Sequence, residues 1–358
     1  MVVLEKWISK VIFGGVITLS CGMAQAQSSM TLYGIVDAGL LYTNKTPNPT
    51  TFQNEGGQFS MNDSGSSPSQ FGMKGVEDLG GGLKAEFDLE SGIDMANGGY
   101  DDSNGNLFGR EAWVALDGNF GDLKAGLQFS PFFFAVAESD PRDLSQFGSA
   151  LILFIDNAVA TGIFTSNAVS YTSPNIDGLK GSVMLALGGA AGDFQAGRQY
   201  SASLKYENGG LMVNAAIFDG NSGGTAQTPV PTTLALEGRT IGAAYRFGDL
   251  TAKASVVNYK VAGELNNYVY GAGLDYTWLP KWDLNGGVWF TSDRSDTTNH
   301  SLMAALGTEY YLSPETSLYA QIGLVDNHGA ETTGLAIGAL NAVQGMTLGA
   351  DMGVRHTF

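Results

Sequence analysis

The chain has 358 residues, of which 44% are hydrophobic and only 15% are charged, with 50 glycines against 10 prolines. This composition is too apolar for a disordered protein. The net charge of −17 and the lack of any basic stripe exclude a nucleic-acid partner, because such binding depends on Lys and Arg neutralising phosphates.

The first 26 residues predict a secretory signal peptide. Lys6 and Lys10 precede a short apolar run, and the sequence AQA at 24–26 offers small residues for cleavage before Gln27. The apolar run is too short to span a bilayer comfortably. Lipoprotein processing at Cys21, the only cysteine, is the alternative. We therefore expect two segments, a signal peptide at 1–26 and one exported domain at 27–358.

Polar and apolar residues alternate along much of the exported domain, which predicts β-strands with two unlike faces. In MTLYGIVDAGLLY at 30–42, Asp37 lies on the face opposite Leu32 and Leu40. GLKAEFDLESG at 82–92 has an apolar face and a charged face, which carries Lys84, Glu86, Asp88 and Glu90. The same pattern continues to the last segment, where Asp351 and Arg355 oppose Leu348, Met352, Val354 and Phe358.

Short turns and long polar stretches punctuate these strands. Seven short turns, at 77–82, 117–122, 174–178, 207–210, 247–249, 279–282 and 312–316, predict eight hairpins and therefore sixteen strands. Longer loops rich in Asn, Ser, Thr and Gly are expected at 44–69, 94–109, 220–238 and 292–300. An even number of antiparallel strands, with short turns at one end and long loops at the other, is typical of an outer-membrane barrel.

A soluble β-sandwich would also have one apolar and one polar face. The strands, however, are commonly about nine residues or longer, as a tilted membrane strand requires. Aromatic residues also gather near strand ends, as in an aromatic girdle. If the charged face of 82–92 met lipid, each Lys at the midplane would cost about 2–4 kcal/mol, so this face must line a watery interior. About sixteen strands leave room for an aqueous lumen.

Five segments in order resemble the Gram-negative trimeric general-diffusion porins of the neisserial type. They are MTLYGIVDAGL, SQFGMKGVEDLGGGLKAEFDLESG, LFGREAWVALDGNFGDLKAG, NAVSYTSPNIDGL and GVRHTF. The resemblance implies an all-β fold, a sixteen-stranded antiparallel transmembrane barrel in the outer membrane of a Gram-negative bacterium. It also implies a homotrimer in outer-membrane lipid that passes small hydrophilic solutes and ions. Phe358 resembles the signal that the outer-membrane assembly machinery reads.

The resemblance further implies that the third long loop, about Ser130 to Phe164, folds inward and narrows the channel. Its acids would face wall arginines, but Gln70 and Phe164 stand where the family commonly has two of these arginines. We therefore expect a weak transverse electric field at the constriction, and a channel that is cation-leaning or weakly selective. The expected constriction comprises Arg110, Lys74, Gln70, Glu138, Asp140 and Asp143, and the expected lumen lining comprises Asp37, Lys84, Glu86, Asp88 and Glu90.

Two other functions are weighed against general diffusion. A channel selective for one sugar or organic cation would use the aromatic residues Phe132, Phe133 and Phe134 of the third loop, although such residues more often pack a loop against a wall. An enzyme would need a catalytic constellation. The three histidines do not have zinc-ligand spacing: His300 and His328 are expected in loops, and His356 on the outward face of the last strand. We expect no catalytic activity, no cofactor and no metal.

Overall fold

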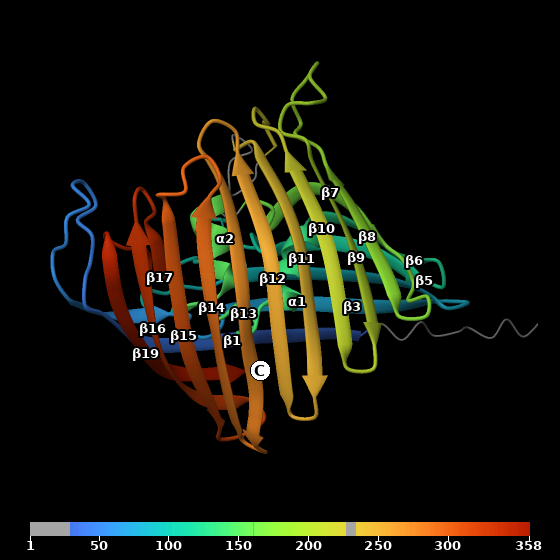
Figure 1. The fold of residues 1–358 in the computed structure, drawn as a ribbon. Coiled ribbons are helices and arrows are strands. Elements are labelled where there is room, and N and C mark those ends of the chain that lie inside the picture. The colour runs from blue at the N-terminus through green and yellow to red at the C-terminus, as the bar shows by residue number, and fades with distance from the viewer. Residues whose placement is uncertain (1–28, 103, 160, 227–233) are drawn as a thin grey trace, which may run out of the picture.

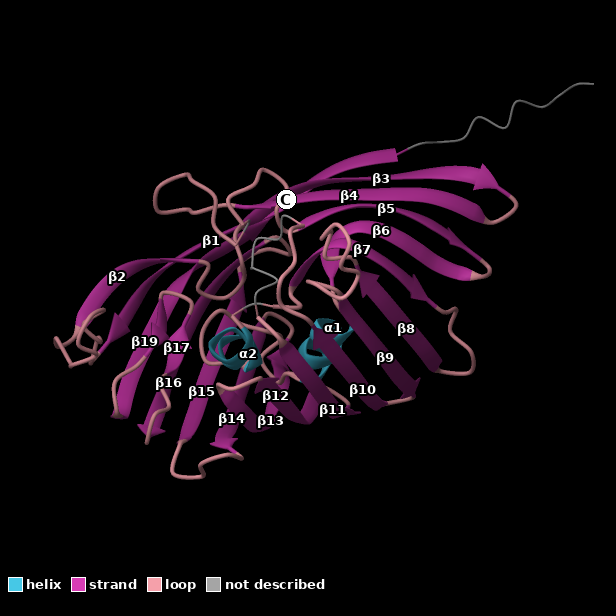
Figure 2. Ribbon diagram, turned by 90° about the horizontal axis from the view of Figure 1, so that it is seen from above, coloured by secondary structure: helices cyan, strands magenta, loops and turns pink. Residues whose placement is uncertain are grey.

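The computed structural model describes residues 29–358 except 103, 160 and 227–233. The predicted signal peptide and the alternative lipidation site at Cys21 therefore lie outside the described residues. In the described part of the chain, no helix is both long and apolar enough to cross a membrane. Figures 1 and 2 show a ring of strands that encloses two short helices.

One large antiparallel sheet closes on itself, because the first strand pairs with the last through Ile35–Thr43 and Gly349–Thr357. Its strands are β1 (Ser29–Thr43), β2 (Gln58–Asp63), β3 (Gln70–Gly80), β4 (Leu83–Gly92), β5 (Glu111–Gly118), β6 (Gly121–Phe129), β7 (Phe164–Thr172), β8 (Leu179–Ala186), β9 (Gln199–Asn208), β10 (Leu211–Gly220), β11 (Leu236–Phe247), β12 (Leu250–Val261), β13 (Leu265–Leu279), β14 (Trp282–Asp293), β15 (His300–Tyr311), β16 (Thr316–His328) and β19 (Gly345–Thr357). A separate hairpin pairs β17 (Thr333–Ala336) with β18 (Ala339–Asn341).

The barrel has sixteen strand positions, as predicted, because β2 and β3 share one of them. The second half of β1 pairs with β2 and its first half pairs with β3. Residues 64–69 interrupt the shared position. The expectation of one continuous loop over 44–69 was therefore wrong, since this stretch contains β2. The sequence QFSMND of β2 does alternate, with the exposed Phe59 and Met61 between polar residues, but its six residues within a long polar stretch are too few to be recognised as a membrane strand.

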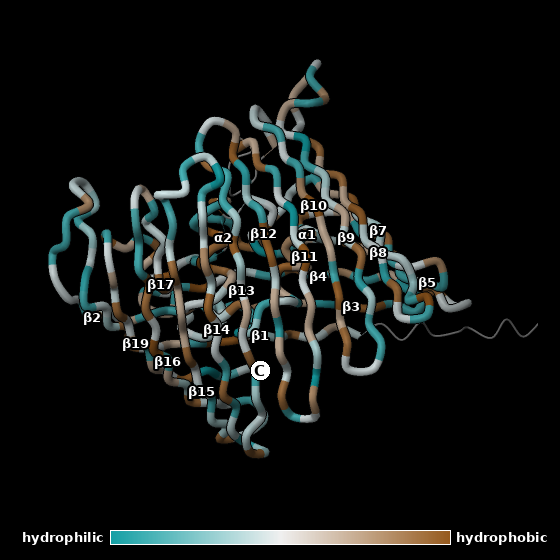
Figure 3. The backbone as a smooth tube through the Cα atoms, viewed as in Figure 1, coloured by the Kyte–Doolittle hydropathy of each residue, from teal (hydrophilic) through white to brown (hydrophobic). Residues whose placement is uncertain are grey.

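All seven predicted short turns join consecutive strands at one end of the barrel, and the long loops gather at the other end (Figure 1). The outward side chains are apolar and exposed, as in Leu32 (61%), Leu40 (63%) and Ile322 (60%). Figure 3 shows the hydropathy alternating along the strands. The predicted orientation, with the apolar face outside and the charged face of β4 inside, is therefore confirmed.

The third loop, 130–163, lies inside the barrel and contains the two helices, α1 (Pro131–Ser139) and α2 (Ala150–Ala158) (Figure 2). A serine caps each helix: Ser130 Oγ accepts the N–H of Phe133, and Ser149 Oγ accepts the N–H of Leu151. Such caps satisfy amide groups that the first turn leaves without a partner. Pro131 suits the first turn, where no backbone N–H is needed.

An apolar core fills part of the barrel interior. Phe132 of α1 and Phe154 of α2 pack against each other with ring centroids 5.7 Å apart, and Tyr259 of β12 contacts both rings. Inward residues of the wall complete this core, among them Leu236, Val257, Val269, Trp289, Met303 and Val325. The inner wall is therefore not polar throughout, and the open part of the lumen lies beside the third loop.

Candidate functional site

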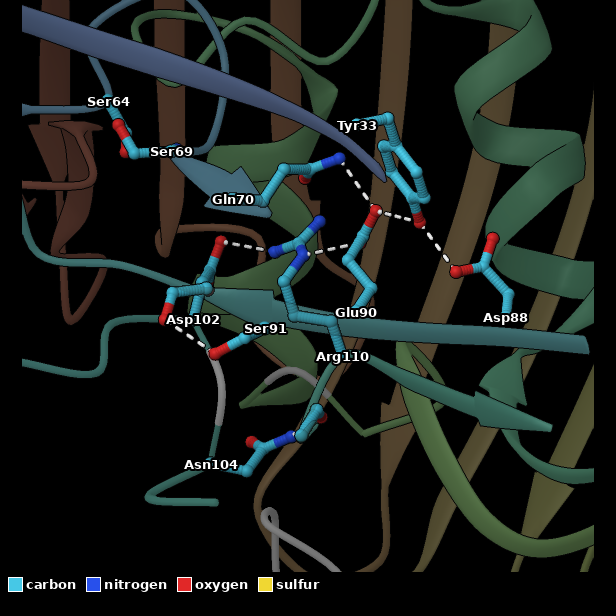
Figure 4. Close-up of polar contacts among 12 residues, drawn as sticks. Tyr33, Ser64, Ser69, Gln70, Asp88, Glu90, Ser91, Asp102, Asn104 and Arg110 are labelled. Atoms are coloured by element: carbon cyan, nitrogen blue, oxygen red, sulfur yellow. Dashed lines mark hydrogen bonds and ion pairs between the residues drawn. The ribbon is translucent and has the colours of Figure 1, made fainter. Parts of the chain in front are cut away.

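A charged network on β3, β4 and the start of β5 faces the interior. Arg110 Nε lies 2.8 Å from Glu90 Oε1, and its Nη1 lies 3.2 Å from Asp102 Oδ2 (Figure 4). Gln70 Nε2 donates to Glu90 Oε2 at 2.8 Å. Glu90, Gln70 and Arg110, which the sequence places far apart, thus converge through the register of neighbouring strands. One guanidinium faces two carboxylates, so this network carries an excess of negative charge.

A tyrosine joins this network to the next inward acid of β4. The Tyr33 hydroxyl donates to Asp88 Oδ1 at 2.6 Å and also contacts Glu90 Oε2 at 3.0 Å. Lys74 Nζ lies 4.8 Å from the centroid of the Tyr33 ring, which is within the range of a cation–π contact. Lys84 and Glu86 follow on β4 toward its short-turn end, and both are at least partly exposed.

Phe164 stands close to Arg110 and carries no charge. Its ring lies 5.5 Å from the Arg110 guanidinium carbon, and Phe129 lies 5.9 Å from it. Phe164 is buried, with 7% of its surface exposed. An aromatic ring and an amide, Gln70, therefore occupy the two positions at which the family resemblance implied cations.

Two acids of the third loop pair with lysines of the opposite wall. Glu138 at the end of α1 contacts Lys205 Nζ of β9 at 2.7 Å and the amide of Asn214 at 3.1 Å. Asp143 contacts Lys253 Nζ of β12 at 2.5 Å. Loop acids and wall cations do face each other, with lysine as the cation. Because each acid is paired with a lysine, these four charges add little to the net electric field inside the barrel.

Asp140 is placed differently from the other loop acids. It is fully buried, and its carboxylate accepts the N–H groups of Leu144 at 2.7 Å and Ala150 at 3.1 Å. Burial raises the pKa of the Asp140 carboxyl to about 6, while these two hydrogen bonds act in the opposite direction. Asp140 thus holds the loop to the start of α2 and presents no surface to the channel, in contrast to its expected place in the constriction.

Arg142 anchors the third loop to the barrel wall. It donates to Asn285 Oδ1 at 2.9 Å, to the carbonyl oxygen of Phe147 at 2.6 Å and also to Gln321 Oε1. Burial lowers the pKa of the Arg142 guanidinium to about 10. Arg142, which lies between α1 and α2, therefore connects the loop to strands β14 and β16. The sequence did not reveal this role.

Asp37 points inward as predicted, but segment 64–67 covers it. Its carboxylate accepts the hydroxyl of Tyr319 at 2.6 Å and the N–H groups of Ser66 and Ser67 at 2.9 and 2.8 Å. Gly65 allows this approach, because a Cβ there would collide with Tyr319 and Asp351. With no exposed surface, Asp37 fixes the inward segment and does not line open lumen.

Two cavities of mixed charge flank the third loop. One of about 240 Å³ lies between α1 and strands β5 to β10 and is lined by three acids and three lysines: Glu111, Asp122, Glu138, Lys124, Lys180 and Lys205. The other, of about 300 Å³, is lined by two acids and two arginines: Asp143, Glu309, Arg142 and Arg355. Each cavity is therefore balanced in formal charge.

The aromatic residues of the third loop divide into packed and exposed members. Phe132 and Phe133 are buried, with 0% and 9% of their surfaces exposed, whereas Phe134 is 47% exposed and lines the 240 Å³ cavity. A row of aromatic faces for a sugar is thus not presented to the lumen. This packing removes the observation on which the substrate-selective alternative rested.

Several residues of the site were missed in the sequence, although their positions carried a signal. Lys205 and Lys253 lie on the inward faces of β9 and β12, so strand alternation alone could have placed them in the lumen. Asp102 lies in an irregular loop, and its contact with Arg110 has no sequence signature.

Comparison with known proteins agrees with this geometry. Residues 15–330 match the model of the Gram-negative porin family. Outer membrane porin protein 32 of Delftia acidovorans is 30% identical, over 94% of this chain and 96% of that protein. Major outer membrane protein P.IB of Neisseria meningitidis serogroup B is 32% identical, over 55% of each chain.

Solved structures support the same assignment. An anion-selective porin from Comamonas acidovorans superposes with a TM-score of 0.80 at 27% identity, over 93% of this chain and 100% of that one. OmpT of Vibrio cholerae shares the fold, with a TM-score of 0.67 at 14% identity over 92% of this chain and 99% of that one. The chain therefore belongs to the Gram-negative porin family and is a β-barrel of the outer membrane.

Proposed function

We propose that this protein is a water-filled channel for passive diffusion of small hydrophilic solutes and ions across the outer membrane, and not an enzyme. The observation that carries the proposal is the pair of cavities with charged residues in their lining beside the third loop, inside a closed barrel with an apolar outer surface. Charged and hydroxyl side chains are part of the lining of both cavities. Such a lining suits the passage of hydrated solutes, and passage of this kind needs no dedicated binding site.

The channel is proposed to be weakly selective and to lean toward cations. Support comes from the balanced charges of the two cavities and from the acid excess around Arg110, where Glu90 and Asp102 are both within 3.2 Å. The solved relative from Comamonas acidovorans is described as anion-selective. In this chain, Gln70 and Phe164 add no positive charge near Arg110, and a ring of fixed charges selects ions by electrostatics.

A homotrimer in outer-membrane lipid is the assembly we propose. A solved OmpT structure is described as a trimer form, although its 14% identity supports the shared fold alone. The exposed outward side chains, such as Leu40 and Ile322, supply an apolar surface for lipid or a neighbouring barrel. Each barrel would be its own pore.

Planar-bilayer recording on the purified protein tests these proposals together. We expect stepwise openings in groups of three and a small reversal potential of cation sign in a salt gradient. Absence of conductance would contradict the channel, and clear anion selectivity would contradict the cation preference. Liposome swelling with sugars of graded size is a second measurement. Rates that fall smoothly with size support general diffusion, whereas a single sugar that saturates transport would favour the selective alternative.

A further inference from the structure

Two histidines that were expected in separate loops meet at the long-loop ends of neighbouring strands. His300 begins β15, His328 ends β16, and the two are directly opposite in the antiparallel register. Their imidazole rings stack, with centroids 4.7 Å apart and an angle of 17° between the planes. The expectation that both residues lie in loops was therefore wrong. Strands β15 and β16 continue beyond the segments in which apolar and polar residues alternate, and the sequence reveals only those segments as strands.

The histidine pair lies on the outer face of the barrel, just beyond the apolar band. His300 is in phase with the exposed Leu302 and Leu306, and His328 is in phase with the exposed Ile322. Asp326 shares this outward face, and a charge is costly within the hydrocarbon layer. The pair is thus placed at the polar rim, and 51% of the His328 side chain is exposed.

We propose that His300 and His328 form a two-imidazole binding site for a divalent transition-metal ion such as Zn²⁺ or Cu²⁺. Imidazole suits these ions, and directly opposed residues of an antiparallel pair have Cβ atoms about 4.5–5.5 Å apart. The ion would replace the ring stacking, since exposed side chains change rotamer freely. No group of three or more His, Cys, Asp or Glu side chains between residues 29 and 358, outside the undescribed gaps, is arranged to hold a metal ion, so water completes the coordination.

A neighbouring carboxylate supports a metal-binding role for His328. Asp326 Oδ2 lies 3.3 Å from His328 Nε2. Metal-bound histidines usually donate their second ring N–H to such a carboxylate, which fixes the ring and its tautomer. This contact leaves Nδ1 of His328 as the donor to the ion. Glu331 also interacts electrostatically with His300, and both acids favour a bound cation.

Titration of the folded, full-length protein without an affinity tag tests the site. Isothermal titration with ZnCl₂ should give saturable binding to the wild type and none to His300→Ala or His328→Ala. Asp326→Asn should weaken binding by about tenfold if Asp326 orients His328. His356→Ala is the matched control, because His356 lies at the opposite end of the barrel and contacts Thr316 Oγ1 at 2.9 Å. This variant should bind as the wild type does.

Electron paramagnetic resonance with Cu²⁺ supplies a second readout that ring packing alone would not produce. Spectra of the wild type and of His356→Ala should show coupling to two imidazole nitrogens, and each single variant of the pair should show one at most. The proposal is overturned if the wild type binds no more Zn²⁺ than the double variant His300→Ala/His328→Ala. It is also overturned if His356→Ala abolishes binding. A wild-type Cu²⁺ spectrum without coupling to imidazole nitrogens would likewise overturn it, and would leave ring packing, including the contact of His300 with Phe290 at 6.1 Å between centroids, as the role of the pair. Unchanged channel conductance shows that each variant is folded.

Discussion

At the scale of single residues, the proposed ion preference depends on how much charge remains uncompensated around Arg110. The Arg110 guanidinium forms ion pairs with Glu90 and Asp102. The neutral side chain of Gln70 donates an amide N–H to the same Glu90. Phe164 is also neutral and Lys74 lies beside the Tyr33 ring, so Arg110 is the cation that contacts Glu90 and Asp102 directly. The proposed cation preference therefore depends on the neutral amide of Gln70 as well as on the charged side chains around it.

Replacing Gln70 by Arg should shift the reversal potential toward anions. The new guanidinium would lie beside Glu90, and one partly exposed charge changes ion energies by about 0.5–1 kcal/mol, which corresponds to a roughly two- to fivefold change in permeability ratio. Planar-bilayer recording in a salt gradient measures this ratio. Gln70→Met, similar in length but uncharged, is the control and should leave it near the wild-type value. An unchanged ratio for Gln70→Arg would show that this network does not set ion preference.

At the scale of elements, the third loop is folded as a small helical unit with its own core. Its helices are capped by Ser130 and Ser149, and Arg142 ties it to the wall through the side chains of Asn285 and Gln321. Phe132 is fully buried between α2 and the wall, whereas Phe134 faces the cavity. The loop is therefore a fixed part of the pore.

The substitution Phe132→Ala should destabilise the protein more than Phe134→Ala. Truncation of a buried Phe typically costs about 3–5 kcal/mol, because it removes apolar contacts and leaves a cavity. We expect Phe134→Ala to cost about 1 kcal/mol or less, since half of its surface is already exposed and only ring contacts with Phe129 and Phe133 are lost. Denaturant unfolding in detergent gives the comparison. Equal losses would mean that the loop core does not contribute to barrel stability.

The structure of this loop could be predicted only in part from the sequence. Its bounds follow from the interruption of strand alternation between Phe129 and Phe164. The burial of Asp140 and the reach of Arg142 to Gln321 do not follow, because they depend on how the helices dock against strands far along the chain. Segment 64–67 was missed because its contacts with Asp37 depend on β2 and β3 both pairing with β1, and the sequence does not show this shared position.

At the scale of the whole molecule, strand number and orientation were predictable because both are encoded locally. Alternation at period two identifies each strand and its wet face, and the seven turns then give the order of antiparallel strands. Pairing among inward side chains was not predictable, since register brings together residues such as Gln70, Glu90 and Arg110 from three segments. The division of the inner wall into an apolar and a polar part also required the position of the third loop.

Phe358 provides a prediction about assembly. Its backbone N–H and carbonyl pair with Gly34 at 3.1 and 3.0 Å, while its ring is 53% exposed on the outer face. Phe358→Ala keeps the backbone pairing, so refolding into detergent should be unchanged. The level of assembled barrel in the outer membrane should fall, because we propose that the exposed ring is recognised by the assembly machinery. Thr357→Ala serves as the control, and equal levels for all three proteins would contradict this role.

Pairing of β1 with β19 joins opposite ends of the polypeptide, through Gly34 and Phe358 among others. An edge of β1 therefore stays without its neighbour until the last strand has been synthesised and exported. Contacts of such high sequence separation form slowly, because the closure entropy of a long chain opposes them. Closure of the barrel therefore follows export of β19, and until then the unpaired edge of β1 can pair with another chain.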